Sequence, residues 1–355
     1  MYTLPFRIRA LVTSSTHQGL PPRMGGLAFL LVQDVFYHSL AVVGVAANLM
    51  TIVILCRGNC GLAGCTVRYL VSMAGSDLLV IILCVILDYL GLLYFPYSVL
   101  THYQVCRINS IMNAAAVDSS VWLTVAFTFD RFIAICCPRL KPKYCTDRVA
   151  LAAIITVCML SYLRNIPRYF TYEAVRGRAS FPVCRLRNLC TKTPWVTYLW
   201  LATVLTPLIP YVAILLLNAL TIRYILLASR ARRGFHTTRS NGRQVDPEME
   251  NRWRSIILLF AISGSFVILW MTKVVTFIFQ EMLLDMSLMV DVVHAGTMLM
   301  YLNSCSNTCI YALTQAKFRE QICGRRRWRH DAARSCHSGG DTCYLSSRGP
   351  CTILI

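Results

Sequence analysis

A few charged side chains stand inside segments that are otherwise apolar. They are Asp77, Asp118, the adjacent Asp130 and Arg131, and Lys273. A charge at the centre of a bilayer costs about 2.5 to 3.5 kcal/mol by insertion scales, so each of these residues requires a partner or a role. Buried acids and cations can bind an ion, receive a charged ligand, or form a pair that opens and closes. These are the chemistries that the sequence offers.

No motif typical of an enzyme accompanies these charges. The sequence contains no Walker loop, no HExxH, no GxSxG and no internal repeat. We therefore expect a protein that is not an enzyme and requires no cofactor.

Seven apolar segments must position the charged residues. Of 355 residues, 56% are hydrophobic and 14% are charged, whereas about 25% are charged in an ordinary soluble protein. A helix that crosses about 30 Å of hydrocarbon needs roughly 20 apolar residues. Runs of that length occur at 31–56, 69–94, 107–137, 149–167, 195–227, 255–280 and 287–313. The sequence predicts an all-α, seven-transmembrane helix bundle over 31–313, between an extracellular segment at 1–30 and a cytoplasmic segment at 314–355.

The net charge is +19, and the distribution of Lys and Arg among the loops indicates how the chain is oriented in the membrane. In a soluble chain this charge would suggest a nucleic-acid partner, but the apolar excess favours a membrane protein and no nucleic acid. The loops after spans one, three and five, together with the C-terminal tail, carry 23 of the 35 Lys and Arg residues. Because cytoplasmic loops retain positive charge, we expect an extracellular N-terminus and a cytoplasmic C-terminus.

The motifs of six spans, taken in order, resemble those of the rhodopsin-like (class A) G-protein-coupled receptors. They are Gly44 to Asn48 in span one, Ala74 to Leu78 in span two, Cys106 with Asp130-Arg131-Phe132 24 positions later in span three, Pro210 in span five, Phe266 to Trp270 in span six, and Asn307 to Tyr311 followed by Phe318 in span seven. Span four lacks Trp, and Lys273 follows Trp270 by three residues. These details resemble the orphan-type branch near peptide receptors and receptors that respond to aromatic amino acids.

The resemblance implies a plasma-membrane receptor that binds an extracellular ligand and activates a heterotrimeric G protein. Membrane lipid and arrestin are the other partners that it implies. One alternative is a receptor-like decoy or partner protein that does not couple. A transporter or ion pump fits less well, because 287–313 has no lysine for a retinal Schiff base and paired broken helices are not evident.

The resemblance also implies a switch that couples to the G protein, formed by Asp130, Arg131, Phe266, Asn307 and Tyr311. Arg131 would pair with Asp130 at rest and be released toward the G protein. The alternative is a static ion pair worth about 0 to 1 kcal/mol.

Two departures from the family pattern bear on this switch. Many relatives lock the arginine with an acid at the base of span six, where this chain has Arg252-Trp253-Arg254, so we expect signalling without ligand. Thr272 and Thr308 replace family prolines, so a kink there needs another cause, such as a Ser/Thr back-bond or inserted water.

A small cage of oxygen atoms is expected below Trp270. By the resemblance it comprises Asp77, Ser120, Asn303, Ser304 and Asn307, and the family uses this position for sodium. The alternative is a polar network filled with water and no ion.

The predicted ligand site comprises Asn113, Val117, Asp118, Trp270, Lys273 and Thr297. Asn113 stands where amine receptors carry Asp, which disfavours a biogenic amine. A zwitterion, such as a small peptide or an aromatic amino acid, could place its ammonium on Asp118 and its carboxylate on Lys273. The alternative is that these two charges pair with each other or with water. Trp270 and Phe266 would sense the ligand, unless Trp270 is an ordinary core residue.

Cysteines add two further predictions. The resemblance implies that Cys106 bonds the loop between spans four and five, where Cys184 and Cys190 are both candidates. Phe318 and Ile322 lie one turn apart among basic residues, which predicts a short amphipathic helix on the inner membrane surface. Cys323 on that helix is a candidate for palmitoylation.

Overall fold

The structure is a computed structural model of the whole chain. The residues it describes are 24–57, 61–95, 98–175, 183–186, 195, 197–198, 201–202, 204–236, 247–280, 286–315, 318–319 and 321.

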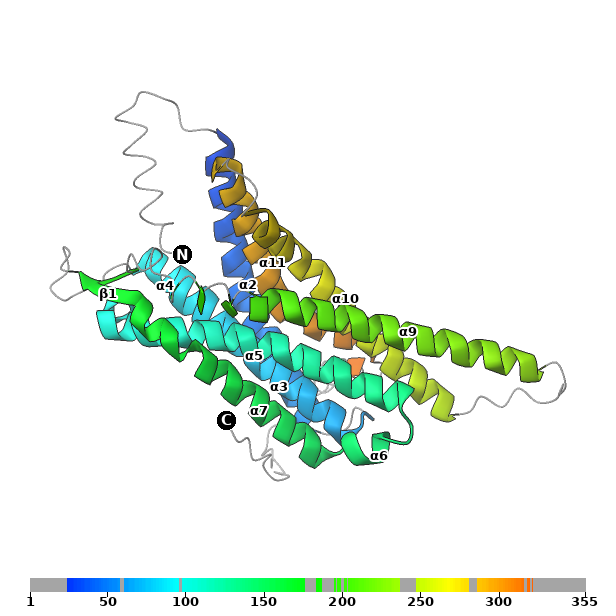
Figure 1. Cartoon of the computed structure of the whole chain (residues 1–355). Coiled ribbons are helices and arrows are strands. Elements are labelled where there is room, and N and C mark those ends of the chain that lie inside the picture. The colour runs from blue at the N-terminus through cyan, green and yellow to red at the C-terminus, as the bar shows by residue number, and fades with distance from the viewer. Residues whose placement is uncertain are drawn as a thin grey trace, which may run out of the picture.

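Seven long helical segments make up the molecule and pack side by side (Figure 1). They are α2 (Met24–Cys56); α3 (Gly64–Val80) continued by η1 (Ile81–Leu90) and α4 (Gly91–Tyr94); α5 (Tyr103–Cys136); α7 (Asp147–Asn165) continued by η3 (Ile166–Thr171); η4 (Val204–Leu208) with α9 (Ile209–His236); α10 (Pro247–Gln280); and α11 (Met286–Thr314). Short turns η2 (Val99–Thr101) and α6 (Lys141–Tyr144) join neighbouring helices. The predicted seven-helix bundle is confirmed.

Six of these segments, in the part of the chain described, are long and apolar enough to cross a membrane. A membrane-spanning helix bonds all its backbone groups internally, which hydrocarbon requires. The seventh, α11, has 29 residues and carries a polar face with Asn303, Ser304, Asn307 and Thr308, all of them buried in the bundle. The polar face of α11 therefore points into the bundle and away from lipid.

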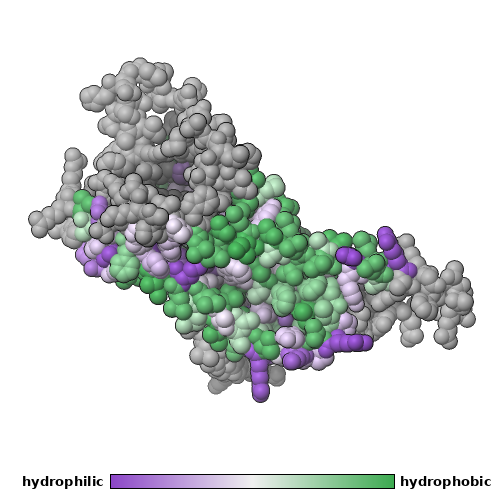
Figure 2. All heavy atoms as spheres, viewed as in Figure 1, coloured by the Kyte–Doolittle hydropathy of each residue, from purple (hydrophilic) through white to green (hydrophobic). Residues whose placement is uncertain are grey.

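The outer flank of the bundle is apolar, as lipid contact requires. Large hydrophobic side chains stand exposed on several helices, among them Leu216, Ile268 and Leu313. Figure 2 shows hydrophobic residues over this flank, with more hydrophilic residues toward the ends. On α10, Ile268 is 66% exposed whereas Trp270 is 4% exposed, so the helix turns one face to lipid and the other inward.

The third span, α5, lies at the centre and contacts α3, α7, α9 and α10. Elsewhere in the bundle, the first and last spans, α2 and α11, approach each other closely at a glycine. A Cβ atom added to Gly44 of α2 would come within 2.5 Å of the Cys305 sulfur on α11, so only glycine permits this approach. Asn48 then donates hydrogen bonds to the carbonyl oxygens of Gly44 (2.9 Å) and Ser304 (2.8 Å), which joins the first and last spans.

Two departures from a regular α-helix occur in the spans. The second span is π-helical over η1, and the fifth begins with the π-helical η4, which contains Pro207. A proline removes a backbone donor and widens the helix locally. Capping residues mark other boundaries: Thr146 accepts a bond from the Val149 N–H at the start of α7, and His102 accepts one from Gln104 at the start of α5.

The connection after η3 adds one feature that the all-α prediction lacks. Strands β1 (Tyr172–Val175) and β2 (Val183–Leu186) form an antiparallel pair in which Ala174 lies opposite Cys184. Cys184 is bonded to Cys106 near the start of α5. We call this end of the bundle the disulfide end, and the opposite end, where α5 finishes, the Arg131 end.

Candidate functional site

The Arg131 end contains a buried ion pair. Asp130 and Arg131 are each 6% exposed, and the carboxylate accepts hydrogen bonds from Nε at 3.0 Å and from Nη2. The remaining guanidinium donor, Nη1, lies 3.5 Å from the Ser255 hydroxyl on α10. The charge of Arg131 is therefore neutralised by its own neighbour, while the sixth span holds it only through a long neutral contact.

Among the described contacts of Arg131, the sixth span contributes the hydroxyl of Ser255 and no acid. The side chains of Arg252 and Arg254 lie outside the described residues, and Trp253 is 53% exposed. Arg131 also approaches the Cys65 sulfur at the start of α3, at 3.5 Å.

Midway through the bundle, Asp77 is fully buried at 0% exposure. Its Oδ1 atom accepts a hydrogen bond from Ser120 at 2.5 Å, and its Oδ2 atom accepts one from Asn307 at 2.8 Å. Asn303 and Ser304 are buried on the same stretch of α11. The structure therefore brings Asp77, Ser120 and Asn307 together as predicted, from three different spans.

The donor set around Asp77 fits a hard cation. No cation pairs with this carboxylate within the described part of the chain, and its two oxygens have about four lone-pair sites, more than the bonds from Ser120, Asn307 and Ser304 occupy. Oxygen ligands with one negative charge suit a hard ion. Asp77, Ser120 and the neighbouring amide and hydroxyl oxygens of α11 would hold it.

Thr308, which replaces the family proline of the last span, bonds to the first span. Its hydroxyl lies 2.7 Å from the Thr51 hydroxyl and donates to the Ala47 carbonyl at 3.1 Å. Among the described contacts, the Thr308 hydroxyl therefore bonds across to α2 and not to a carbonyl of its own helix.

Trp270 and Phe266 stack on α10, with ring centroids 5.3 Å apart. Val121 of α5 and Ile214 of α9 complete this buried cluster, and Val117 packs against it. The Trp270 Nε1 donor is buried and makes no hydrogen bond among the described residues. Near the Arg131 end, Tyr311 is buried and meets Phe318 edge to face. The two aromatic pairs belong to separate buried clusters.

The two charges expected to share the ligand site are not paired with each other. Asp118 is ion-paired with Arg164, accepts a bond from Asn165 and a second from the Thr206 hydroxyl at 2.7 Å. Arg164 also donates to that hydroxyl at 2.8 Å. The prediction that Asp118 and Lys273 offset each other is wrong, because the ends of α7 and η4 supply nearer partners.

Lys273 faces the seventh span. Its ammonium group donates to the Thr297 hydroxyl at 3.2 Å, and no described carboxylate pairs with it. A Cβ atom on Gly296 would lie 3.4 Å from the Lys273 backbone nitrogen, so α10 and α11 touch closely here. Asn113 of the predicted site has a buried side-chain oxygen without a hydrogen bond among described residues.

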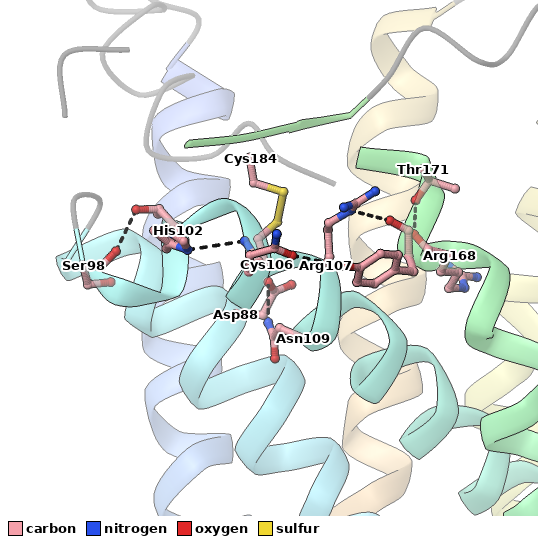
Figure 3. Close-up of a disulfide and its surroundings, with 12 residues drawn as sticks. Asp88, Ser98, His102, Cys106, Arg107, Asn109, Arg168, Thr171 and Cys184 are labelled. Atoms are coloured by element: carbon pink, nitrogen blue, oxygen red, sulfur yellow. Dashed lines mark hydrogen bonds between the residues drawn. A yellow bond between two sulfur atoms is a disulfide. The ribbon is translucent and has the colours of Figure 1, made fainter. Parts of the chain in front are cut away.

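At the disulfide end, the Cys106–Cys184 bond joins α5 to β2 (Figure 3). Beside it, Arg107 donates to the Tyr169 carbonyl at 2.6 Å and lies over the Tyr169 ring at 3.9 Å. Of the two candidate partners of Cys106, Cys184 is the one that forms the disulfide bond. Cys190 and Cys323 lie outside the described residues.

Comparison with known proteins decides the family. The model of the 7 transmembrane receptor (rhodopsin family) matches residues 47–311, which is most of the chain. The chain belongs to the rhodopsin family of seven-transmembrane receptors. It is similar to the growth hormone secretagogue receptor type 1 of Sus scrofa, 26% identical over 295 residues covering 80% of this chain and 77% of that one.

Two further relatives bear on the placement of this rhodopsin-family chain. The Mus musculus growth hormone secretagogue receptor type 1 is 26% identical over 294 residues, 80% of this chain and 78% of that receptor. The gastrin/cholecystokinin type B receptor of Sus scrofa is 31% identical over 160 residues, 44% and 34% of the two chains. These proteins are receptors and not enzymes, in agreement with the sequence.

A thiol of this rhodopsin-family chain lies against the ion pair at the Arg131 end. Cys145, between α6 and α7, donates to the Asp130 carbonyl at 3.6 Å. Burial, and then the negative charge of Asp130, raise the pKa of Cys145 to about 12. The loop after the third span is therefore packed onto Asp130.

Sequence reasoning missed the partners of Asp118, which are the cation Arg164 and the neutral donors Asn165 and Thr206. It also missed Asp88, which lies in the second span. The signal for Arg164 was its place at the end of an apolar segment, four residues from Arg168. Asp88 was visible as an acid inside the run 69–94.

Proposed function

We propose that this rhodopsin-family chain is a ligand-activated receptor that promotes nucleotide exchange in a heterotrimeric G protein. Its disulfide end faces the outside of the plasma membrane and its Arg131 end faces the cytoplasm, with the N-terminus outside. The observation that carries the proposal is the buried Arg131, neutralised by Asp130 and touched by Ser255 of α10. Outward movement of α10 uncovers a cation that the G protein can bind.

The coupling proposal uses two states of one ion pair. At rest, Asp130 neutralises Arg131 within α5, which satisfies a buried charge that would otherwise be costly. Small helix shifts, of about 1 to 2 Å at subunit interfaces, are among the common switching movements of allosteric proteins. Because Ser255 offers Arg131 a hydroxyl in place of a carboxylate, separation from α10 costs little. The receptor therefore signals to an appreciable extent without ligand.

The Asp77 network connects the ligand side to this switch. Asp77 joins α3, α5 and α11 through Ser120 and Asn307. A bound sodium ion would supply positive charge to the buried carboxylate and hold the three spans in the resting arrangement. A network of water is the competing occupant, and the effect of sodium on nucleotide exchange separates the two.

For the ligand we propose a small peptide or an amino-acid-like zwitterion. Asn113 offers no anion to a biogenic amine, while Lys273 presents an ammonium group without a described acidic partner. The relatives are named for a growth hormone secretagogue, gastrin and cholecystokinin, and this supports a ligand from the extracellular side.

The further partners are proposed from the family and the sequence. Arrestin would bind the same cytoplasmic end, and membrane lipid would contact the apolar flank. Palmitoylation of Cys323 would attach the segment after α11 to the inner leaflet.

Nucleotide exchange with purified components tests the proposal. The receptor is reconstituted in lipid nanodiscs and mixed with heterotrimeric G proteins of each class, with empty nanodiscs as the control. Faster exchange than with empty nanodiscs supports the receptor function. Exchange at the empty-nanodisc rate with every G protein, from a folded receptor, would favour the decoy alternative.

A further inference from the structure

Two partly buried charges near the disulfide end have no ion pair among the residues that the structure describes. Asp88 lies in η1 of the second span and Lys273 in α10. Among the described residues, their polar contacts are with neutral groups: Asn109 lies 3.5 Å from the Asp88 carboxylate, and Thr297 lies 3.2 Å from the Lys273 ammonium. Unpaired charges within spans are costly and mark functional positions.

Asp88 points into the bundle. Figure 3 shows Asp88 and Asn109 facing each other close to the Cys106–Cys184 bond. Tyr301 of α11 and Cys84 lie within electrostatic range of the Asp88 carboxylate. The side chain therefore sits between the second, third and seventh spans, where a ligand that enters from the disulfide end would arrive.

The two charges lie beside the same face of α11. Lys273 contacts Thr297 and Asp88 lies near Tyr301, and residues four apart in a helix share a face with a rise of about 6 Å. A positive group on α10 and a negative group on the second span thus lie near the same turn of α11.

The acid that sequence reasoning assigned to the ligand is already engaged. Asp118 accepts bonds from Arg164, Asn165 and Thr206, so binding a ligand ammonium there would break a buried ion pair. Such a loss is strongly unfavourable. Asp88 requires no such loss.

The described side chains around Tyr301 are aromatic and apolar. Tyr37 and Tyr89 lie 3.9 Å apart between ring centroids, and Tyr301 packs against Tyr37. Val117 packs against two buried clusters, one that Tyr301 also packs against and one that contains Trp270. These groups suit an apolar body between two charged ends.

We propose that Asp88 receives the ammonium group and Lys273 the carboxylate of a zwitterionic ligand of amino-acid or short-peptide size. This assignment rests on the proposed receptor function and names its ligand chemistry. It replaces Asp118 with a residue of the second span.

The test uses a dipeptide with free and blocked ends. Thermal unfolding of the purified, full-length receptor in nanodiscs is followed with phenylalanyl-phenylalanine, its N-acetyl form and its C-terminal amide. Wild type should bind the free dipeptide about tenfold more tightly than either blocked form, since a lost charge-assisted bond is worth about 1.5 kcal/mol or more.

Two neutral isosteres separate the ends. Asp88→Asn should bind the free and N-acetyl forms equally yet still prefer the free acid to the amide. Lys273→Gln should show the reverse pattern. Asp88→Glu and Lys273→Arg, which keep the charges, should retain both preferences. Asp34→Asn is the matched control, because this acid lies on α2 with His38 as its partner and should leave both preferences unchanged.

Several outcomes would overturn the assignment. They are no binding of the free dipeptide by folded wild type, equal binding of all three forms, or loss of both preferences together in each variant. The result is independent of coupling. A receptor with the expected pattern that never accelerates exchange retains this site and loses the proposed function, whereas one that accelerates exchange without the pattern loses only this site.

Discussion

Asn307 of α11 donates a 2.8 Å hydrogen bond to Asp77 of α3, and so joins residues 230 positions apart in the sequence. The same carboxylate accepts a bond from Ser120 of the central helix. Because buried polar groups must keep their partners, movement of any one of these three spans requires the other two to adjust. The network therefore couples the positions of the second, third and seventh spans.

Removing the charge at this link should change signalling and spare the fold. We expect Asp77→Asn to reduce ligand-driven exchange and to abolish any effect of sodium, because a neutral amide attracts the cation weakly. Exchange is measured with and without sodium at constant ionic strength, alongside surface expression. Ser76→Ala is the control, since its hydroxyl bonds only within its own helix. A full sodium response in Asp77→Asn would exclude this site.

Adding an acid next to Arg131 should lower the signalling of the receptor without ligand. Ser255→Glu places a carboxylate where Arg131 now meets a hydroxyl at 3.5 Å. A new ion pair worth about 1 kcal/mol shifts the resting equilibrium about fivefold, so exchange without ligand should fall by about that factor. Ser255→Gln, of similar size without charge, is the matched control. Equal reduction by Gln and Glu would argue against an electrostatic lock.

Breaking the Asp118–Arg164 pair should destabilise the receptor. Asp118→Ala leaves a largely buried guanidinium without its partner, which costs about 3 kcal/mol. Thr206→Val removes one neutral donor and should cost about 1 kcal/mol. Thermal unfolding of purified protein should rank the two variants in that order, with the exposed Asp34→Ala close to wild type. The opposite ranking would mean that the pair carries little of the stability.

Substitution of the two loop cysteines, Cys184 and Cys190, should affect cell-surface expression differently. Cys184→Ser opens the bond that ties β2 to α5, and loss of a disulfide typically costs 2 to 5 kcal/mol. Cell-surface expression of Cys184→Ser should therefore drop, whereas Cys190→Ser should be expressed like wild type. Equal loss in both variants would indicate that both cysteines are bonded.

Cys145 should react slowly with alkylating agents. Burial and Asp130 raise its pKa to about 12, so the thiol stays protonated at neutral pH, and the thiolate is the reactive species. Its alkylation by iodoacetamide, followed by mass spectrometry, should be far slower than in the unfolded chain and should accelerate only in strongly alkaline solution. Equal rates in folded and unfolded protein at neutral pH would show that the loop does not pack on Asp130.

The bundle and its switch residues could be predicted because hydropathy and motif spacing are local signals. The positions of Asp77, Ser120 and Asn307 followed from family motifs, and the structure brings them together. The partner of Asp118 could not be predicted, since it depends on how far α7 runs before Arg164 turns inward. The choice between Cys184 and Cys190 depends on the pairing of β1 with β2. The periodicity of that short loop does not predict this pairing. Asp88 is visible as an acid inside the run 69–94, but its contact with Asn109 of the third span could not be predicted from spacing along the chain.

The most direct test of the account is the role of Arg131. Nucleotide exchange by a purified heterotrimeric G protein is measured with wild type and Arg131→Ala receptors at equal density in nanodiscs, after thermal unfolding confirms that both are folded. The account predicts that wild type accelerates exchange without ligand and that Arg131→Ala falls to the rate of empty nanodiscs. Exchange by Arg131→Ala at the wild-type rate would contradict it.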